Sequence, residues 1–275
     1  MRVLPAGKYL EVLAFVAVWM AAGWIFRLDV NAYLLLGVPL VALFQLFIRR
    51  QPLQKLWARE AASFRLGLVG IVLAALLILA PGYDLVVVAL PKRLWVVALW
   101  LLCALAGAVF AAFALRHQQA SATRRGLRGF IAALLIGIAI MGAGALARHH
   151  SIGFPLPKLF FLLKQFLLYF VVSFALEEVA FRGALDSHLY QPPSNGQAIG
   201  SPWLSAIFVS ALWGLWHLPT LSIPSAPAFA AAIPALIIVH TLVGVPLSFC
   251  WRASGTLVLP AAAHALIDAY RNTVL

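Results

Sequence analysis

The chain has 275 residues, of which 64% are hydrophobic and 10% charged, and its mean hydropathy is +0.99. Soluble domains have about 45–50% apolar and about 25% charged residues, so this composition excludes a soluble globular protein and indicates a polytopic membrane protein. The formal net charge of +12 does not indicate a nucleic-acid partner, because the Lys and Arg residues lie between apolar segments and form no single patch.

Apolar stretches recur along the whole chain, and a helix of about 20 such residues crosses a bilayer core of about 30 Å. We therefore expect an all-α, polytopic transmembrane helix bundle of eight or nine helices. The number depends on how Pro81 and Gly82 divide the region between residues 66 and 93, where the first helix ends at 81 or extends to Leu90. The expected segments are residues 9–26, 31–48, 66–81, 94–115, 129–147, 160–189, 203–218, 228–250 and 256–271.

Basic residues are unevenly divided between alternate loops. The 49–65 loop has five Lys and Arg residues and the 116–128 loop has four, whereas the first, third and fifth loops have one, two and two. Cytoplasmic loops are enriched in Lys and Arg, so the sequence predicts a cytoplasmic N-terminus.

One apolar helix contains charged residues in its interior. The segment from Ser173 to Gly183 includes Glu177, Glu178 and Arg182. A charge at the centre of a membrane helix costs roughly 2.5–3.5 kcal/mol, so ionisable groups there predict a functional site. The spacing of four residues favours an ion pair between Glu178 and Arg182. Whether the helix ends at Gly183 or continues to Tyr190 stays open.

Further polar residues occur on two later helices. His217 lies at the end of an apolar segment, and His264 and Asp268 are four residues apart, on one helical face. Carboxylates and imidazoles brought together from three helices could perform general acid and base hydrolysis. The common serine-nucleophile and zinc-helix motifs are absent from the sequence.

These residues resemble the CAAX prenyl endopeptidase and bacteriocin-processing (CPBP, or Abi) family of intramembrane proteases. The family signatures are Glu-Glu-x-x-x-Arg, aromatic-x-x-x-His and His-x-x-x-Asn or Asp, in that order. Here they read Glu177-Glu178-x-x-x-Arg182, Trp213-x-x-x-His217 and His264-x-x-x-Asp268. The resemblance covers about residues 160–272 and leaves the first five helices unexplained.

The resemblance implies a role for each motif. Glu177 and His217 would activate a water, His264 and Asp268 would position the substrate carbonyl, and Glu178 and Arg182 would hold the site. A cofactor is then not required.

Two positions depart from the usual family pattern. Trp213 replaces a Phe, and Asp268 replaces the common Asn. An ionised Asp only accepts hydrogen bonds, so Asp268 must be protonated, orient His264 or bind a metal. A zinc-dependent version with Glu177, His217, His264 and Asp268 as ligands therefore stays an alternative.

The sequence thus predicts an intramembrane endopeptidase of the bacterial inner membrane. Its partners would be the lipid bilayer and a membrane-associated peptide or protein, which could be prenylated. Residues 1–150 would form N-terminal transmembrane helices of unassigned role, and residues 151–275 a catalytic core of four transmembrane helices. A proton-coupled transporter and a non-catalytic immunity or scaffold protein are alternatives. Trp213, Trp216 and Phe174 are expected to wall the cavity, and His240 to bond a neighbouring helix.

Overall fold

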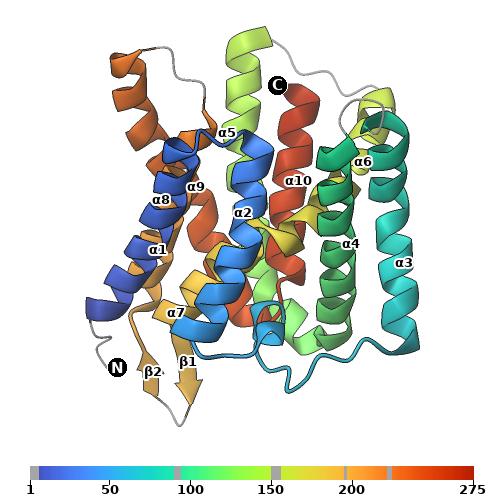
Figure 1. Cartoon of the computed structure of the whole chain (residues 1–275), viewed down its shortest axis with the longest axis vertical. Helices are drawn as coiled ribbons and strands as arrows, with labels where there is room; N and C mark the ends of the chain where they lie inside the picture. The colour runs from blue at the N-terminus through green and yellow to red at the C-terminus, as the bar shows by residue number, and fades with distance from the viewer. Residues whose placement is uncertain (1–5, 90–93, 150–155, 195–196, 222–224) are drawn as a thin grey trace.

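The structure, a computed structural model, is a bundle of long helices (Figure 1). It describes all residues except 1–5, 90–93, 150–155, 195–196 and 222–224. Each of the nine predicted segments contains a helix, which confirms the all-helical bundle. The long helices are α1 (Ala6–Ile25), α2 (Val30–Leu43), α3 (Gly67–Asp84), α4 (Leu94–His117), α5 (Ala120–His149), α6 (Leu156–Ala175), α8 (Pro202–Trp216), α9 (Ala226–Ser254) and α10 (Val258–Val274).

The expected number of eight or nine membrane helices is not supported. Seven helical stretches of the described chain are long and apolar enough to cross a membrane. Helix α8 has 15 residues and α10 has 17, or about 22 and 26 Å, so both are short for a bilayer core. Pro81 lies inside α3 and does not divide it.

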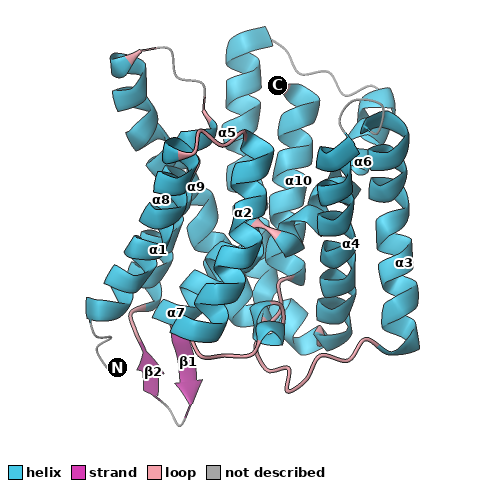
Figure 2. Ribbon diagram, in the orientation of Figure 1, coloured by secondary structure: helices cyan, strands magenta, loops and turns pink. Residues whose placement is uncertain are grey.

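Short elements continue or connect the long helices. They are the π-helical turns η1 (Phe44–Ile48), η3 (Leu85–Ala89) and η4 (Val179–Asp186), the 3₁₀ turns η2 (Leu53–Leu56) and η5 (Leu218–Thr220), the helical turn α7 (Ser187–Leu189), and strands β1 (Gln191–Ser194) and β2 (Gln197–Ile199). The two strands pair antiparallel and project from one end of the bundle (Figure 2).

Three connecting segments meet at the end of the bundle that holds this hairpin. Ala58 pairs with Thr256 through a β-bridge, and the Arg59 amide donates to the Gly255 carbonyl. Arg116 donates to the Arg65 carbonyl. We call this side, made of residues 49–66, 117–120 and 252–257, the basic end. The other side, where α2 begins and α8 and α10 end, is the opposite end (Figure 1).

Aromatic residues connect the first two helices to α8. Trp19 Nε1 donates to the Tyr33 carbonyl, and the Tyr33 hydroxyl donates to the Trp216 carbonyl, at 2.9 and 2.8 Å. The Trp19 and Tyr33 rings also pack against Trp216, with centroids 5.0 and 5.3 Å away. Large apolar side chains on the outer faces of α3 and α4 are exposed, as expected of surfaces that face lipid.

The charged helix continues beyond its glutamates. After α6, a turn at Leu176 leads through Glu177 and Glu178 into η4 and α7, and the helical stretch ends at Leu189. Glu177 therefore lies twelve residues before the end, or about 18 Å along the axis, well inside the bundle. Figure 1 shows this segment crossing the middle of the bundle.

Candidate active site

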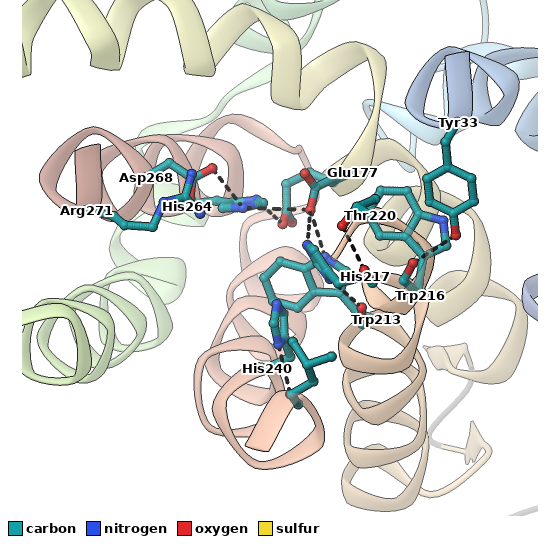
Figure 3. A network of polar contacts seen from close by, with 12 residues as sticks. Tyr33, Glu177, Trp213, Trp216, His217, Thr220, His240, His264, Asp268 and Arg271 are labelled. Carbon is teal, nitrogen blue, oxygen red and sulfur yellow. Dashed lines mark hydrogen bonds and ion pairs between the residues drawn. The ribbon is translucent and has the colours of Figure 1, made fainter. Parts of the chain in front are cut away.

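A cavity of about 430 Å³ lies between α2, α5, α6, α8, α9 and α10. Four of the six predicted site residues line it, namely Glu177, His217, His264 and Asp268. The other lining residues are Val30, Leu34, Met141, Tyr169, Trp213, Trp216, Thr220, Leu221, Leu236, Val239, His240, Val243, Ile267 and Arg271. Glu177 and Asp268, which are 91 positions apart in sequence, thus face one space (Figure 3).

The Glu177 carboxylate is the centre of this arrangement. Its Oε2 accepts a hydrogen bond of 2.8 Å from Trp213 Nε1. The same oxygen lies 3.7 Å from His217 Nε2 and 4.0 Å from His264 Nε2. Both distances are too long for a direct hydrogen bond, and a water between the groups could bond to each. The Glu177 side chain is 21% exposed.

His217 is held in one orientation by its own helix. Its Nδ1 lies 2.8 Å from the Trp213 carbonyl oxygen, and a carbonyl only accepts, so Nδ1 carries the hydrogen. In the neutral ring, Nε2 then has a free lone pair toward Glu177. The Thr220 hydroxyl donates to the His217 carbonyl at 2.7 Å and stabilises the end of α8.

His264 is surrounded by carboxylates. Its Nδ1 lies 2.9 Å from Glu178 Oε1, and its Nε2 lies 3.4 Å from Asp268 Oδ2. Asp268 Oδ1 in turn pairs with Arg271 at 2.8 Å. Of the three roles expected for Asp268, orienting His264 is the one that this geometry fits.

Glu178 and Arg182 lie behind the cavity. Arg182 Nε is 3.7 Å from Glu178 Oε2, and the two side chains are 0% and 1% exposed. This is the predicted ion pair within one helix. The Arg182 guanidinium also lies 4.7 Å from the Trp213 ring centre, while its three nitrogens have no hydrogen-bond partner among the described residues. The pair therefore supports Trp213 and His264 from the protein interior.

Two predictions about side chains near the cavity, those for His240 and Phe174, were wrong. His240 Nδ1 bonds the Leu236 carbonyl of its own helix at 2.8 Å, and among the described residues His240 has no hydrogen bond to a neighbouring helix. Its ring lines the cavity, 4.3 Å from the His217 ring and 4.7 Å from Trp213. Phe174 does not wall the cavity, because it is fully buried on another side of the helix, where its carbonyl accepts from Trp57.

Sequence reasoning did not include His240 among the site residues. The available signal was a histidine inside a long apolar helix, but no motif distinguishes it from a structural one. Its proximity to His217 depends on the close approach of α8 and α9 at Gly214. A side chain there would place Cβ 2.5 Å from the Leu236 carbonyl oxygen.

The donor atoms of the zinc alternative lie near one another, and the pair His264 Nε2 and Asp268 Oδ2 is 3.4 Å apart. Among the described residues, no group of three or more His, Cys, Asp or Glu is arranged to hold a metal ion. Ligands of tetrahedral zinc at about 2.0–2.2 Å from the metal lie roughly 3.3–3.6 Å apart. The nitrogens of His217 and His264 are 3.7 and 4.0 Å from Glu177 Oε2, so these donors would have to approach one another.

Comparison with known proteins supports the resemblance inferred from the motifs. Residues 159–270 match the family described as type II CAAX prenyl endopeptidase Rce1-like. The matched region contains all six predicted site residues and the segments that carry them. No curated protein and no solved structure matches the chain.

Proposed function

Because residues 159–270 belong to the Rce1-like type II CAAX prenyl endopeptidase family, we propose that the chain is an intramembrane endopeptidase that uses Glu177 and His217 to activate water. One observation carries this proposal. Glu177 Oε2 faces His217 Nε2 at 3.7 Å inside a cavity, and a water between them would contact a carboxylate and an imidazole lone pair. This is the arrangement that general-base hydrolysis requires.

In the proposed reaction, Glu177 takes a proton from the water while the oxygen attacks the carbonyl carbon of the peptide bond. The second O–H of the water donates a hydrogen bond to His217 Nε2, which aligns the attack, and this hydrogen stays on the attacking oxygen. The protonated Glu177 then delivers its proton to the leaving amine, so that the water supplies all the atoms added to the two products.

His264 would stabilise the oxygen of the tetrahedral intermediate. Its Nε2 faces the cavity between Glu177 and Asp268, and in the imidazolium form Nε2–H donates to an oxyanion. Glu178 fixes the ring through Nδ1, and Arg182 neutralises Glu178. These two are positioning residues, since neither lines the cavity.

The substrate we propose is a peptide bond in a membrane-associated peptide or protein. A prenylated carboxyl terminus is the narrower version of this proposal. We also propose that the protein lies in a bacterial inner membrane with its N-terminus in the cytoplasm, because basic residues gather at the end of the bundle where α1 begins.

Cleavage of a quenched fluorescent peptide library by the purified protein in detergent tests the mechanism. Glu177→Gln and His217→Ala should each lower the rate at least about 100-fold, the lower range for a general acid or base. Glu60→Gln, which alters an exposed carboxylate at the basic end, is the matched control and should cleave normally. Normal cleavage by Glu177→Gln would exclude Glu177 as the base.

A chelator decides between the glutamate mechanism and the zinc alternative. We propose that no metal is required, so treatment with a zinc chelator should leave cleavage unchanged. Loss of cleavage on chelation, with recovery on adding zinc, would assign Glu177, His217, His264 and Asp268 to a metal instead.

A further inference from the structure

A second polar cavity, of about 460 Å³, lies at the basic end of the bundle. It shares no lining residue with the active-site cavity. Its lining includes two carboxylates, Glu11 and Glu60, and four cations, Lys8, Arg49, Lys55 and Arg59. The fold therefore brings a lysine from the start of α1 beside basic residues of the 49–65 loop. We call this space the basic cavity.

The four cations of the basic cavity lack anionic partners. Among the residues that the structure describes, none of them forms an ion pair with a carboxylate. Glu11 instead faces His188, whose Nε2 lies 2.6 Å from the Glu11 carboxylate. Lys8 Nζ is 3.4 Å from the His188 carbonyl oxygen, and Lys55 Nζ donates to the Gln51 side chain at 2.9 Å. Both acceptors are neutral, so an anion in the cavity would supply the counter-charge that the two ammonium groups lack.

The two arginines have donors left for a ligand. Arg49 uses one nitrogen, Nη1, for its bond of 2.8 Å to the Gly183 carbonyl. Arg59 Nη2 donates to the Arg252 carbonyl at 2.6 Å, while its buried Nε has no hydrogen-bond partner among the described residues. Burial lowers the pKa of the Arg59 guanidinium, so a nearby anion would stabilise its charged form. A guanidinium carries five N–H donors in a planar fork that matches the oxygens of a phosphate group.

The basic cavity lies where three membrane-spanning stretches end. Lys8 is in the first turn of α1, Ile48 is the last residue of η1, and His188 lies in α7, next to the end of its stretch. The ends of spanning helices lie at the level of the lipid head groups. Phe47 and Ile48, beside the cavity, are 67% and 49% exposed. A ligand here is therefore close to head groups and to hydrocarbon.

An apolar groove of about 440 Å³ begins on the same segment of the chain. It lies between α2 and α4, and Leu53 and Leu56 of η2 line it, whereas Lys55 of the same turn lines the basic cavity. All the described residues that line the groove are apolar. Val38 and Leu102 on its walls are exposed, so the groove is open to the bilayer. A lipid with its phosphate in the basic cavity would thus have apolar surface for a chain on the other side of η2.

We propose that the basic cavity binds the phosphate group of an anionic phospholipid, with an acyl chain of that lipid in the groove between α2 and α4. Basic pockets between membrane helices bind such head groups. A zwitterionic phospholipid has the same phosphate but also a cation, which the four unpaired basic side chains would repel. Inorganic phosphate has the anion without the hydrocarbon. The proposal depends neither on the protease function nor on the side of the membrane that the basic end faces.

Native mass spectrometry of the purified full chain in a non-ionic detergent tests this site. Phosphatidylglycerol and phosphatidylcholine with the same acyl chains are titrated separately, and the wild type should bind the anionic lipid at least about fivefold more tightly. Equal affinities for the two lipids would overturn the proposal. Inorganic phosphate at the same concentration should leave the anionic lipid bound, and displacement by it would assign the cavity to a free phosphate ion instead. This comparison needs no variant.

A double variant, Lys8→Gln with Lys55→Gln, locates the binding. Its affinity for phosphatidylglycerol should fall about 30-fold, since each basic residue near an anionic lipid contributes a factor of about five. Arg65→Gln with Arg124→Gln is the matched control and should bind like the wild type, because it removes two exposed cations that do not line the cavity. Lys8→Arg with Lys55→Arg keeps both charges and should also retain binding. Equal losses in the two Gln variants would show attraction by overall charge and would overturn the site.

Discussion

The hydrogen bond from Trp213 to Glu177 gives a sharp prediction for the substitution Trp213→Phe. Phenylalanine keeps a ring over Arg182 but removes the Nε1–H that fixes Glu177 Oε2 at 2.8 Å. A hydrogen bond to a charged group contributes about 1.5–3 kcal/mol, and 1.36 kcal/mol corresponds to tenfold in rate. We expect kcat/KM for a cleaved library peptide to fall about 10- to 150-fold, because Glu177 can then rotate away from His217.

Trp216→Phe is the matched control for this experiment. Trp216 is three residues further along, is buried to a similar extent and also lines the cavity, but its Nε1 has no hydrogen-bond partner among the described residues. Both substitutions remove similar ring volume, so thermal unfolding in detergent should show similar losses of stability. Only Trp213→Phe should lose most of its activity. Equal activity in the two variants would show that Glu177 does not need this hydrogen bond.

Three further predictions concern the support of the site. Gly214→Ala should lower the unfolding temperature and the cleavage rate, because the new Cβ would lie 2.5 Å from the Leu236 carbonyl oxygen. Gly144→Ala is the control and should be nearly neutral, because the nearest atom to its new Cβ is 3.9 Å away. Equal effects of the two substitutions would contradict the packing argument. Asp186→Asn should destabilise the fold by about 3–5 kcal/mol in thermal or denaturant unfolding, because Arg252 loses its buried carboxylate. An unchanged unfolding midpoint would show that the remaining partners of Arg252 suffice. A zinc chelator should leave both the cleavage rate and the unfolding temperature unchanged, and a fall in either would indicate a bound metal.

Much of the bundle could be predicted because a helix that crosses a bilayer needs about 20 consecutive, mostly apolar residues. Long apolar windows locate the helices, and the segment predicted at residues 160–189 ends at Leu189 in the structure. The lengths of the helices were predicted less well than their positions. The segments predicted at residues 203–218 and 256–271 form helices α8 and α10, but these have 15 and 17 residues and are shorter than the seven stretches that meet the length and hydropathy requirements.

The site could be predicted only as far as its motifs extend. The spacing within each motif brought Glu177, His217, His264 and Asp268 together as candidates, and the structure places all four around one cavity. The bond from Trp213 to Glu177 joins residues 36 positions apart, so no local pattern predicts it. Trp213 stands where the family usually has Phe, and its indole supplies a hydrogen bond to Glu177 that Phe cannot make.

The contacts of Tyr33 have a consequence for attempts to shorten the protein. The matched family region begins at residue 159, but α2 supplies Val30 and Leu34 to the cavity wall, and the Tyr33 hydroxyl satisfies the last carbonyl of α8. A truncated or transplanted catalytic half would leave Trp216 against lipid and one wall of the cavity missing. A minimal functional protease built from this chain must therefore retain its first two helices, although they lie outside the segment by which the family is recognised.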